Sequence, residues 1–234
     1  MKRSEINRAL REMEAMIQAY RISLPPFCQF TPQEWKTKGH AFDEVRDNLL
    51  GWDITDYGLG EFDRVGFSLI TLRNGNLAKK EQYPKTYAEK LLYLKEGQYS
   101  PNHFHWNKTE DIINRAGGTL LIRVYNSLPD ESLDEQSSVT VHLDGATRTV
   151  PAGTQVRLLP GMSISIPPRL YHDFEVEPGT GPVLIGEVSA VNDDVTDNRF
   201  LPPVGRFPAI EEDEPPYRLL CTEYPKACEE EVQD

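Results

Sequence analysis

The apolar residues in the first part of the chain recur at helical spacing. Over residues 5–21 they share one face of an α-helix, at Ile6, Ala9, Leu10, Met13, Met16, Ile17 and Tyr20. Ser4 belongs to a residue type that caps helix N-termini, so we expect the helix to begin there. An isolated helix of this length is marginal in water. Its apolar face should therefore pack on the rest of the protein or on a second subunit.

Two further helical signals follow. Thr31-Pro32-Gln33-Glu34 combines a capping box with proline at the first helical position. Residues 42–50 (FDEVRDNLL) resemble a short helix that Gly51 would end. We therefore expect helices over residues 32–50.

From about residue 52 the pattern changes to short β-rich runs. These are GFSLITLR, AEKLLYLK, GTLLIRVYN, SVTVHL, TQVRLL, SISIPP and PVLIGEVSAV. Turn-forming pairs lie between them, at Asn74-Gly75, Gly117-Gly118, Asp144-Gly145 and Pro160-Gly161. Many short strands without intervening helices favour a sandwich or a small barrel. The expected fold is an all-β core over about residues 60–200.

The chain divides by these patterns into three parts. Residues 1–55 are expected to form an N-terminal helical extension. Residues 201–234, rich in proline and acidic residues, should wrap over the surface and end in a disordered acidic tail. The 234 residues suit one sizeable domain, and no internal repeat divides them, so we expect residues 1–234 to be a single domain.

The composition limits the kinds of binding partner and the cellular compartment that we expect. A formal net charge of −12 disfavours a nucleic-acid surface, which needs basic residues. No apolar run approaches the roughly 18 residues of a membrane span, and the start MKRSEINRAL lacks the apolar region of a signal peptide. Three cysteines, Cys28, Cys221 and Cys228, without a CxxC pair are typical of reduced thiols. We therefore expect a cytoplasmic protein without a nucleic-acid or membrane partner.

Residues 101–111 (PNHFHWNKTED) contain three potential metal ligands. On a strand His103 and His105 project to the same side while Phe104 faces the other way, and Glu110 follows across a short turn. A lone HxH pair is more often a packed or exposed feature than a ligand pair. A metal site therefore needs another ligand, for which His142 and His172 are available.

The spacing around these residues resembles the two motifs of the cupin superfamily. The first is matched by Gly97, His103, His105, Glu110 and Gly117 at the family's intervals.

The second motif is matched by Gly161, Pro167 and His172. Arg169 and Val176 stand where a glycine and an asparagine are usual. This resemblance implies an antiparallel cupin (jelly-roll) barrel and His172 as the fourth ligand, and it leaves His142 as a surface residue. Three imidazoles and one carboxylate suit a divalent ion such as Mn, Fe, Co, Ni or Zn.

Several ionisable residues are placed to line such a site. Strand alternation predicts that Lys90 and Glu187 face inward, and Lys108 lies between two ligands. Asp173 follows His172. Alternatively, Lys90 and Glu187 form a structural ion pair.

A polar stretch, VNDDVTDNRF, follows the last predicted strand. It contains Asp193, Asp194 and Asp197, and Arg206 lies beyond it. We expect this stretch to cover the barrel mouth, although its aspartates could equally be turn and cap residues. A metal together with lysines and carboxylates is typical of a pocket for a polyhydroxylated substrate.

The sequence resembles the cupin-type D-lyxose isomerase family over nearly its whole length. The matching stretches are DNLLGWDITDYG, GQYSPNHFHWNKTEDI, RLYHDFE and GEVSAVNDDVTDNRF. The resemblance implies a manganese-dependent aldose–ketose isomerase that interconverts D-lyxose with D-xylulose, and often D-mannose with D-fructose. It also implies a homodimer.

Isomerisation moves a proton between C1 and C2 through a cis-enediol. Glu187 is the expected base and Lys108 the expected proton donor. Asp193 is a further catalytic candidate and, like Asp173, an alternative base. Lys90, Asp173 and Arg206 are expected to bind substrate hydroxyls.

Two other functions fit the same ligands. A metal-dependent cupin dioxygenase would favour an apolar pocket, whereas this one is expected to be charged. A non-catalytic sugar-binding cupin would not require so many ionisable groups at the metal.

Overall fold

The computed structural model describes residues 1–194 and 196–229. Its strands are β1 (Gly51–Thr55), β2 (Phe67–Arg73), β3 (Tyr87–Leu94), β4 (Tyr99–His105), β5 (Glu110–Gly117), β6 (Leu120–Ser127), β7 (Leu133–Asp134), β8 (Val139–Leu143), β9 (Ala146–Val150), β10 (Gln155–Leu158), β11 (Ser163–Ile166), β12 (Tyr171–Val176), β13 (Val183–Ala190) and β14 (Asn198–Phe200). The helices are α1 (Arg3–Ala19), α2 (Pro32–Trp35) and α3 (Asp43–Asp47), with 3₁₀ turns η1 (Pro26–Gln29) and η2 (His40–Phe42).

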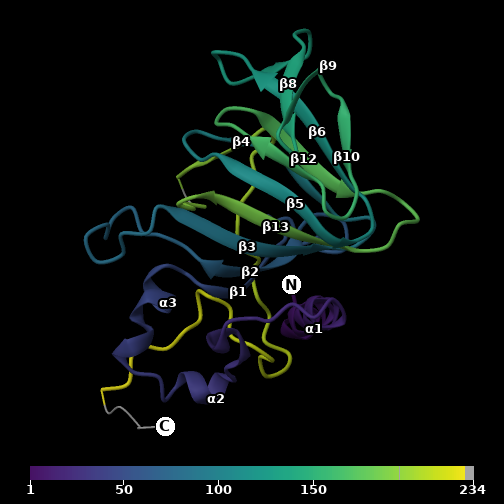
Figure 1. Cartoon of the computed structure of the whole chain (residues 1–234). Coiled ribbons are helices and arrows are strands. Elements are labelled where there is room, and N and C mark those ends of the chain that lie inside the picture. The colour runs from purple at the N-terminus through teal and green to yellow at the C-terminus, as the bar shows by residue number, and fades with distance from the viewer. Residues whose placement is uncertain (195, 230–234) are drawn as a thin grey trace.

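The strands form two antiparallel sheets that curl around a common core (Figure 1). Within the described residues, one sheet has eight strands in the order β1-β2-β3-β13-β5-β11-β8-β9. The other has the order β10-β6-β12-β4-β14, with β7 beside β6. This arrangement confirms the predicted all-β barrel with helices outside it.

The apolar core lies between the two sheets because alternate residues of each strand face inward. On β8, Val139 and Val141 are buried, whereas Thr140 and His142 are exposed. The core also includes Phe67, Leu69, Leu92, Leu94, Ile112, Leu120, Ile122, Val124, Leu158, Ile164, Phe174 and Ile185. The exposed position of His142 agrees with its prediction as a surface residue.

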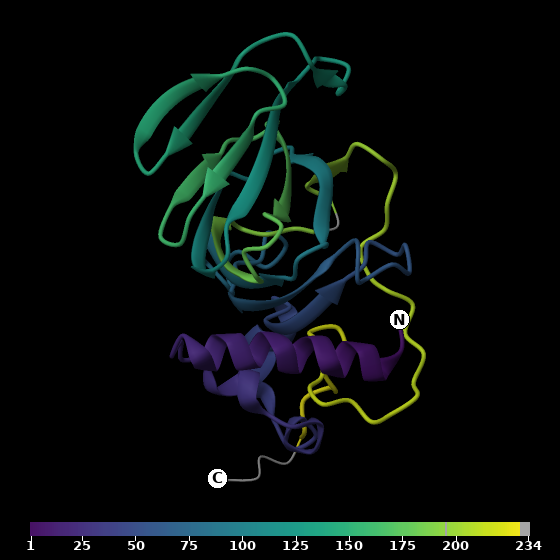
Figure 2. The same cartoon turned by 90° about the vertical axis from the view of Figure 1, so that its right-hand side faces the viewer.

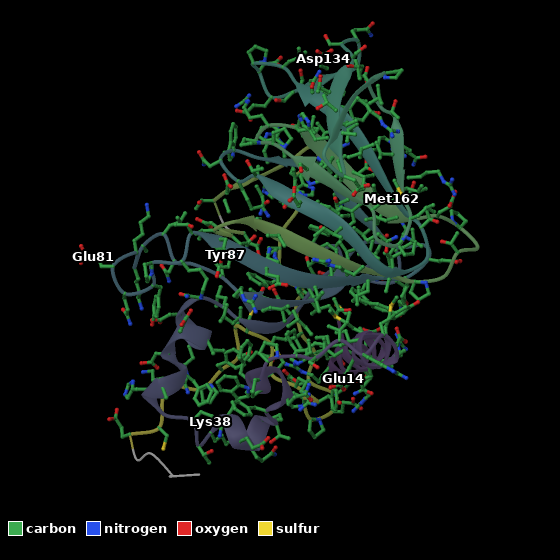
Figure 3. All side chains as sticks on the ribbon, viewed as in Figure 1. Glu14, Lys38, Glu81, Tyr87, Asp134 and Met162 are labelled. Carbon is green, nitrogen blue, oxygen red and sulfur yellow. The ribbon has the colours of Figure 1, made fainter. Side chains whose placement is uncertain are left out.

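Helix α1 covers the outer face of the eight-stranded sheet (Figures 1 and 2). Its buried stripe consists of Ile6, Ala9, Leu10, Met13 and Ile17. The stripe packs in one cluster with Trp52, Ile54, Ile70, Leu91 and Leu184 from the sheet. Side chains fill the space between the two layers (Figure 3). The prediction of an amphipathic helix is confirmed, and its partner is the barrel of the same chain.

The expected start of α1 was wrong by a few residues. The helix begins at Arg3, where the Lys2 backbone N–H donates to the Glu5 carboxylate at 2.7 Å. Ser4 lies inside the helix, and its hydroxyl donates to Asp213 at 2.6 Å instead of capping. Tyr20, assigned to the apolar face, is 51% exposed.

The predicted capping box at Thr31 is confirmed. The Glu34 N–H donates to the Thr31 hydroxyl at 3.2 Å, and the Thr31 N–H donates to the Glu34 carboxylate at 2.7 Å. Helix α2 nevertheless ends after one turn, at Trp35. None of the described helices is long and apolar enough to cross a membrane.

The helices expected over residues 32–50 are present as α2 and α3, but they cover only Pro32–Trp35 and Asp43–Asp47. The Arg46 guanidinium donates to the carbonyls of Lys38 and Gly39 at 2.7 and 3.0 Å, which holds the chain in a bend between α2 and η2. Leu49 has a φ of +52°, outside the helical range. Strand β1 then begins at Gly51, so part of the segment expected as helical extension belongs to the sheet.

The C-terminal segment runs alongside the barrel and past α1 (Figure 2). The Arg3 guanidinium pairs with Glu212 at 2.6 Å and with Glu223. The Asn7 side chain donates to the Pro215 carbonyl at 2.9 Å. These contacts join the two ends of the chain. The end of the expected acidic tail, residues 230–234, lies outside the described residues.

Replacing Leu10 with alanine should lower the free energy of unfolding by about 2–5 kcal/mol, because it removes a fully buried side chain between α1 and the sheet. Urea unfolding followed by circular dichroism measures the change. Tyr20→Ala on the same helix is the control and should change stability by less than about 0.5 kcal/mol. Equal effects of the two substitutions would contradict the packing described for α1.

Candidate active site

The four expected metal ligands meet at one end of the barrel. His103 and His105 share a face of β4, and His172 on β12 lies directly opposite His103 in the strand register. Glu110 is the first residue of β5. Their ligand atoms all lie within 4.8 Å of one another, and all four side chains are buried. Strand alternation and the pairing of β12 with β4 therefore build a site that could hold a metal ion.

The hydrogen bonds of the three histidines leave the metal-binding nitrogens free. The Nδ1 atoms of His103, His105 and His172 lie 2.8, 3.1 and 3.1 Å from backbone carbonyl oxygens. Because a carbonyl only accepts, Nδ1 carries the proton and Nε2 keeps its lone pair. This is the tautomer that a metal ligand requires.

The ligand cluster also lacks a positive charge at the point where its ligand atoms converge. The Nε2 atoms of His105 and His172 lie 3.3 and 3.0 Å from Glu110 Oε1, yet they are buried and make no hydrogen bond. Burial and the neighbouring rings of His172 and His105 lower the pKa of His103 well below its usual value, so this ring is neutral. Orphaned lone pairs beside a carboxylate fit a divalent cation.

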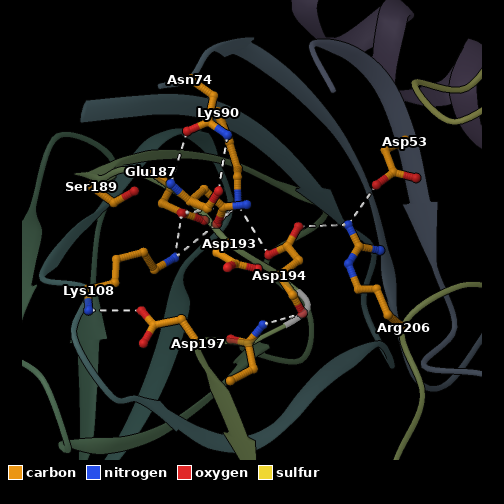
Figure 4. A network of polar contacts seen from close by, with 12 residues as sticks. Asp53, Asn74, Lys90, Lys108, Glu187, Ser189, Asp193, Asp194, Asp197 and Arg206 are labelled. Carbon is orange, nitrogen blue, oxygen red and sulfur yellow. Dashed lines mark hydrogen bonds and ion pairs between the residues drawn. The ribbon is translucent and has the colours of Figure 1, made fainter. Parts of the chain in front are cut away.

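Charged side chains form a network from Lys108, which contacts the ligand Glu110, to Arg206 (Figure 4). The Lys108 ammonium lies 2.7 Å from Glu110 Oε2 and 2.9 Å from Glu187 Oε1. Lys90, paired with Glu187 in the register of β3 and β13, approaches the same oxygen at 3.3 Å. The prediction that Lys90 and Glu187 face inward is correct, and the ion pair between them is part of a larger network.

The network keeps Glu187 and Lys108 ionised although both are buried. Burial alone would raise the pKa of Glu187, but the ammonium groups of Lys108 and Lys90 outweigh it and lower that pKa. Burial would also lower the pKa of Lys108, but Glu110 and Glu187 reverse the effect and raise it. A carboxylate and an ammonium group are thus held in contact next to the ligand cluster.

Arg206 stands at the far end of the network. Its Nη2 donates to Asp53 on β1 at 2.6 Å and to Asp194 at 3.3 Å (Figure 4). Asp194 Oδ1 lies 3.8 Å from the Lys90 ammonium. The other guanidinium nitrogen, Nη1, is buried without a hydrogen-bond partner, and Arg206 lines the cavity that holds the ligands. Arg206 thus lines the cavity with a guanidinium group that two carboxylates hold in place.

The cavity combines these charges with an apolar floor. Its lining includes Tyr57, Phe67, Leu69, Leu92, Ile112, Phe174 and Phe200 beside Lys90, His103, His105, Lys108, Glu110, Glu187, Asp194, Asn198 and Arg206. Its free volume is about 50 Å³. Several ionisable groups in a cavity that is otherwise apolar can bind hydroxyls and transfer protons.

Two candidate residues do not reach the cavity. Asp173 follows His172 on β12 and therefore points to the opposite face, where it accepts a hydrogen bond from Asn102 at 3.2 Å and lies 3.7 Å from Arg123. Asp193 caps its own turn by accepting from the Thr196 backbone N–H at 3.0 Å. Neither belongs to the cavity lining, so the geometry does not support the roles expected for them.

The structure adds residues that received no role from the sequence. Asp194 lines the cavity in the place expected for Asp193. Asn192 accepts a hydrogen bond from Lys90 at 2.5 Å. Asp197 accepts from the backbone N–H groups of Asn107 and Lys108 at 2.8 and 2.9 Å, which fixes the loop between the ligand strands. Neighbouring aspartates with different partners could not be separated by sequence pattern.

The departure from the second cupin motif at Arg169 also has a structural account. Arg169 has a φ of +64°, a backbone conformation that glycine adopts without strain. Its guanidinium lies 5.2 Å from the Phe104 ring and 5.3 Å from the Trp106 ring, on the side away from the ligands. Phe104 is fully buried there. The side chain thus contributes a contact of its own at a strained position.

Solved structures with a similar fold show the fold class of the chain. L-ribose isomerase of Cellulomonas parahominis with L-ribose has a TM-score of 0.59 at 17% identity, over 90% of this chain and 98% of that one. L-ribose isomerase of Geodermatophilus obscurus has a TM-score of 0.58 at 17% identity, with the same coverage. At this identity the likeness establishes the fold, which is the predicted cupin barrel.

Comparison with related sequences identifies the family to which the chain belongs. The profile of the D-lyxose isomerase family matches residues 1–224. The D-lyxose/D-mannose isomerase of Serratia proteamaculans is 48% identical over 96% of this chain and 98% of its own length. The corresponding protein of Escherichia coli O157:H7 is 47% identical with the same coverage. The chain therefore belongs to the D-lyxose isomerase family and is a sugar isomerase.

Replacing His105 with alanine should abolish stoichiometric binding of a divalent ion, because it removes one of four convergent ligands. Elemental analysis after dialysis measures the bound metal. His142→Ala, an exposed histidine whose ring lies 3.1 Å from the Thr147 hydroxyl, is the control and should keep full occupancy. Full occupancy in His105→Ala would reject the ligand set.

Proposed function

We propose that the protein is a manganese-dependent aldose–ketose isomerase that interconverts D-lyxose with D-xylulose and D-mannose with D-fructose. The observation that carries the proposal is the contact of buried Glu187 with Lys108, which itself touches the metal-site residue Glu110. The names of the relatives support the two aldoses, and the resemblance to the family supports manganese. A charged lining does not favour a dioxygenase, and family membership disfavours a non-catalytic cupin.

His103, His105, Glu110 and His172 would hold the ion. When bound, it would supply Lewis-acid stabilisation of negative charge on the substrate oxygens. The three imidazoles present lone pairs, and the carboxylate supplies the one negative charge among the ligands. The ligand set alone does not select among first-row metals.

Glu187 is proposed as the base. Its ionised carboxylate would take the proton from C2 of the aldose and return it to C1 of the cis-enediol, so that no net proton is consumed. The site is buried, which favours retention of that proton against exchange with water. The lysines that lower its pKa keep it deprotonated and ready before the sugar binds.

Lys108 is proposed to exchange protons with the substrate oxygens at C1 and C2. Its ammonium lies between Glu110 and Glu187, which places it next to both the ligand cluster and the base. Lys90 would orient Glu187 and bind a hydroxyl. Arg206, which lines the cavity, would bind a hydroxyl further along the sugar chain, with Asp194 beside it as an acceptor.

Substituting Glu187 with glutamine should lower kcat on D-lyxose by roughly 10²–10⁴, because the amide keeps the size of the side chain but cannot accept the C2 proton. Metal content should be unchanged. Asp173→Asn is the matched control, since this carboxylate follows a ligand but points away from the cavity, and it should keep near-normal kcat. A normal kcat in folded, metal-loaded Glu187→Gln would reject Glu187 as the base.

We further propose a cytoplasmic homodimer. The resemblance to the family supports the dimer, and the buried free thiols of Cys28 and Cys221 support a reducing compartment. Sedimentation velocity at micromolar concentration should give twice the mass of one chain. A single species with the mass of one chain would contradict the dimer.

A further inference from the structure

We infer that Asn74 is a positioning residue of the isomerase site, which acts on the two lysines through Asn192. The inference rests on the proposed function of Lys90, Lys108 and Glu187 and adds residues that no comparison assigns.

The side-chain oxygen of Asn192 is shared by both lysines. The Lys90 ammonium donates to Asn192 Oδ1 at 2.5 Å, and the Lys108 ammonium does so at 3.4 Å. Glu110, Glu187 and Asn192 together provide three acceptors for the Lys108 ammonium group. An ammonium group has three N–H donors, so each donor has one acceptor. Glu187 and Asn192 thus form the two bridges between the lysines.

A neutral bridge has a specific electrostatic advantage. The amide oxygen of Asn192 orients both ammonium groups without adding negative charge, whereas an acidic residue there would compete with Glu187 for them. Asp194 lies 3.8 Å from the Lys90 ammonium and 3.3 Å from Arg206 Nη2, which joins the lysines to the Arg206 end of the cavity. The direction of the Asn192 side chain therefore affects both lysines, which contact Glu187 and Glu110.

Asn74 fixes the backbone of Asn192. The Asn192 N–H donates to Asn74 Oδ1 at 2.9 Å, and Asn74 Nδ2 donates to the Asn192 carbonyl at 3.1 Å. Asn74 is only 7% exposed, and its own carbonyl accepts from the Asn48 side chain at 3.1 Å. It is not among the described residues that line the metal cavity. Its connection to the site therefore runs through Asn192.

The chain next to Asn74 passes very close to another part of the backbone. Asn74-Gly75 was expected as a tight turn, but β2 and β3 are joined by the longer segment 74–86. A Cβ at Gly75 would collide with the Lys85 carbonyl where the two ends of this segment pass each other. Glycine here permits a crossing that sets the position of Asn74.

The test compares kcat/KM on D-lyxose for Asn74→Ala, Asn192→Ala and the double variant. Asn74→Ala should lose about 10- to 100-fold, as expected when supporting hydrogen bonds of a site are removed. If Asn74 acts through Asn192, the double variant should be no worse than Asn192→Ala alone. Multiplicative losses would overturn the inference, as would activity of Asn74→Ala close to that of the unmodified enzyme.

Asn7→Ala is the matched control. The buried Asn7 side chain also clamps a backbone segment, donating to the Pro215 carbonyl at 2.9 Å and accepting from the Tyr217 N–H at 2.8 Å. It should lower stability without lowering kcat/KM. If Asn74→Ala fails to fold, Asn74→Asp replaces it, because aspartate keeps the acceptor and loses only the donor. Asn74→Asp should lose less kcat/KM than Asn74→Ala. Combined with Asn192→Ala, it should cause no loss beyond that of Asn192→Ala alone.

A second measurement separates this inference from the proposed function. Lysine-selective ¹⁵N NMR of the zinc-loaded protein reports the ammonium groups of Lys90 and Lys108 without turnover. Asn74→Ala should shift the same two signals as Asn192→Ala, and Asn7→Ala should not. Unchanged signals would overturn the inference, whereas an unmodified enzyme that converts neither aldose would overturn the proposed function alone.

Discussion

The contact of the Lys108 ammonium with two buried carboxylates is the interaction on which the site depends. Glu110 faces the ligand cluster and Glu187 faces the cavity, and without a cation between them the two negative charges would repel each other. Burying charges is costly unless each one is paired, and removing one member of such a group leaves its partners uncompensated. The barrel therefore has to supply every partner in place. Lys108 lies on the short loop between β4 and β5, which Asp197 fixes through two backbone N–H groups.

The barrel brings the partners together from distant parts of the sequence. His172 meets His103 through the β12–β4 pairing, and Glu187 meets Lys90 through the β13–β3 pairing. Because both pairings are antiparallel ladders within a packed core, small displacements of one member are opposed by many contacts. This rigidity suits a reaction in which a single proton moves between neighbouring carbons.

The features that local spacing encodes could be predicted from the sequence. Alternation placed His103 and His105 on one face and predicted that Lys90 and Glu187 face inward. The same rule would have excluded Asp173, which directly follows a ligand. The role of Asp193 stays a prediction, and the geometry favours its neighbour, because Asp194 lines the cavity whereas Asp193 accepts from the Thr196 N–H.

Long-range contacts limited the prediction of the fold as well. The helix signal over residues 32–50 was local, but the Arg46 contacts with Lys38 and Gly39 bend the chain within it. The role of Asn192 depends on its distance from both lysines in three dimensions, which no periodicity records. Polar residues in an irregular segment obtain their function from such contacts, and sequence spacing alone cannot assign them.

The N-terminal helix is connected to the cavity by one further chain of contacts. Arg206 pairs with Asp53 of β1, and the buried stripe of α1 packs in one cluster with Trp52 and Ile54 of the same strand. The helix thus packs on the strand that carries Asp53. The helical extension therefore packs on the strand whose Asp53 holds Arg206 at the cavity.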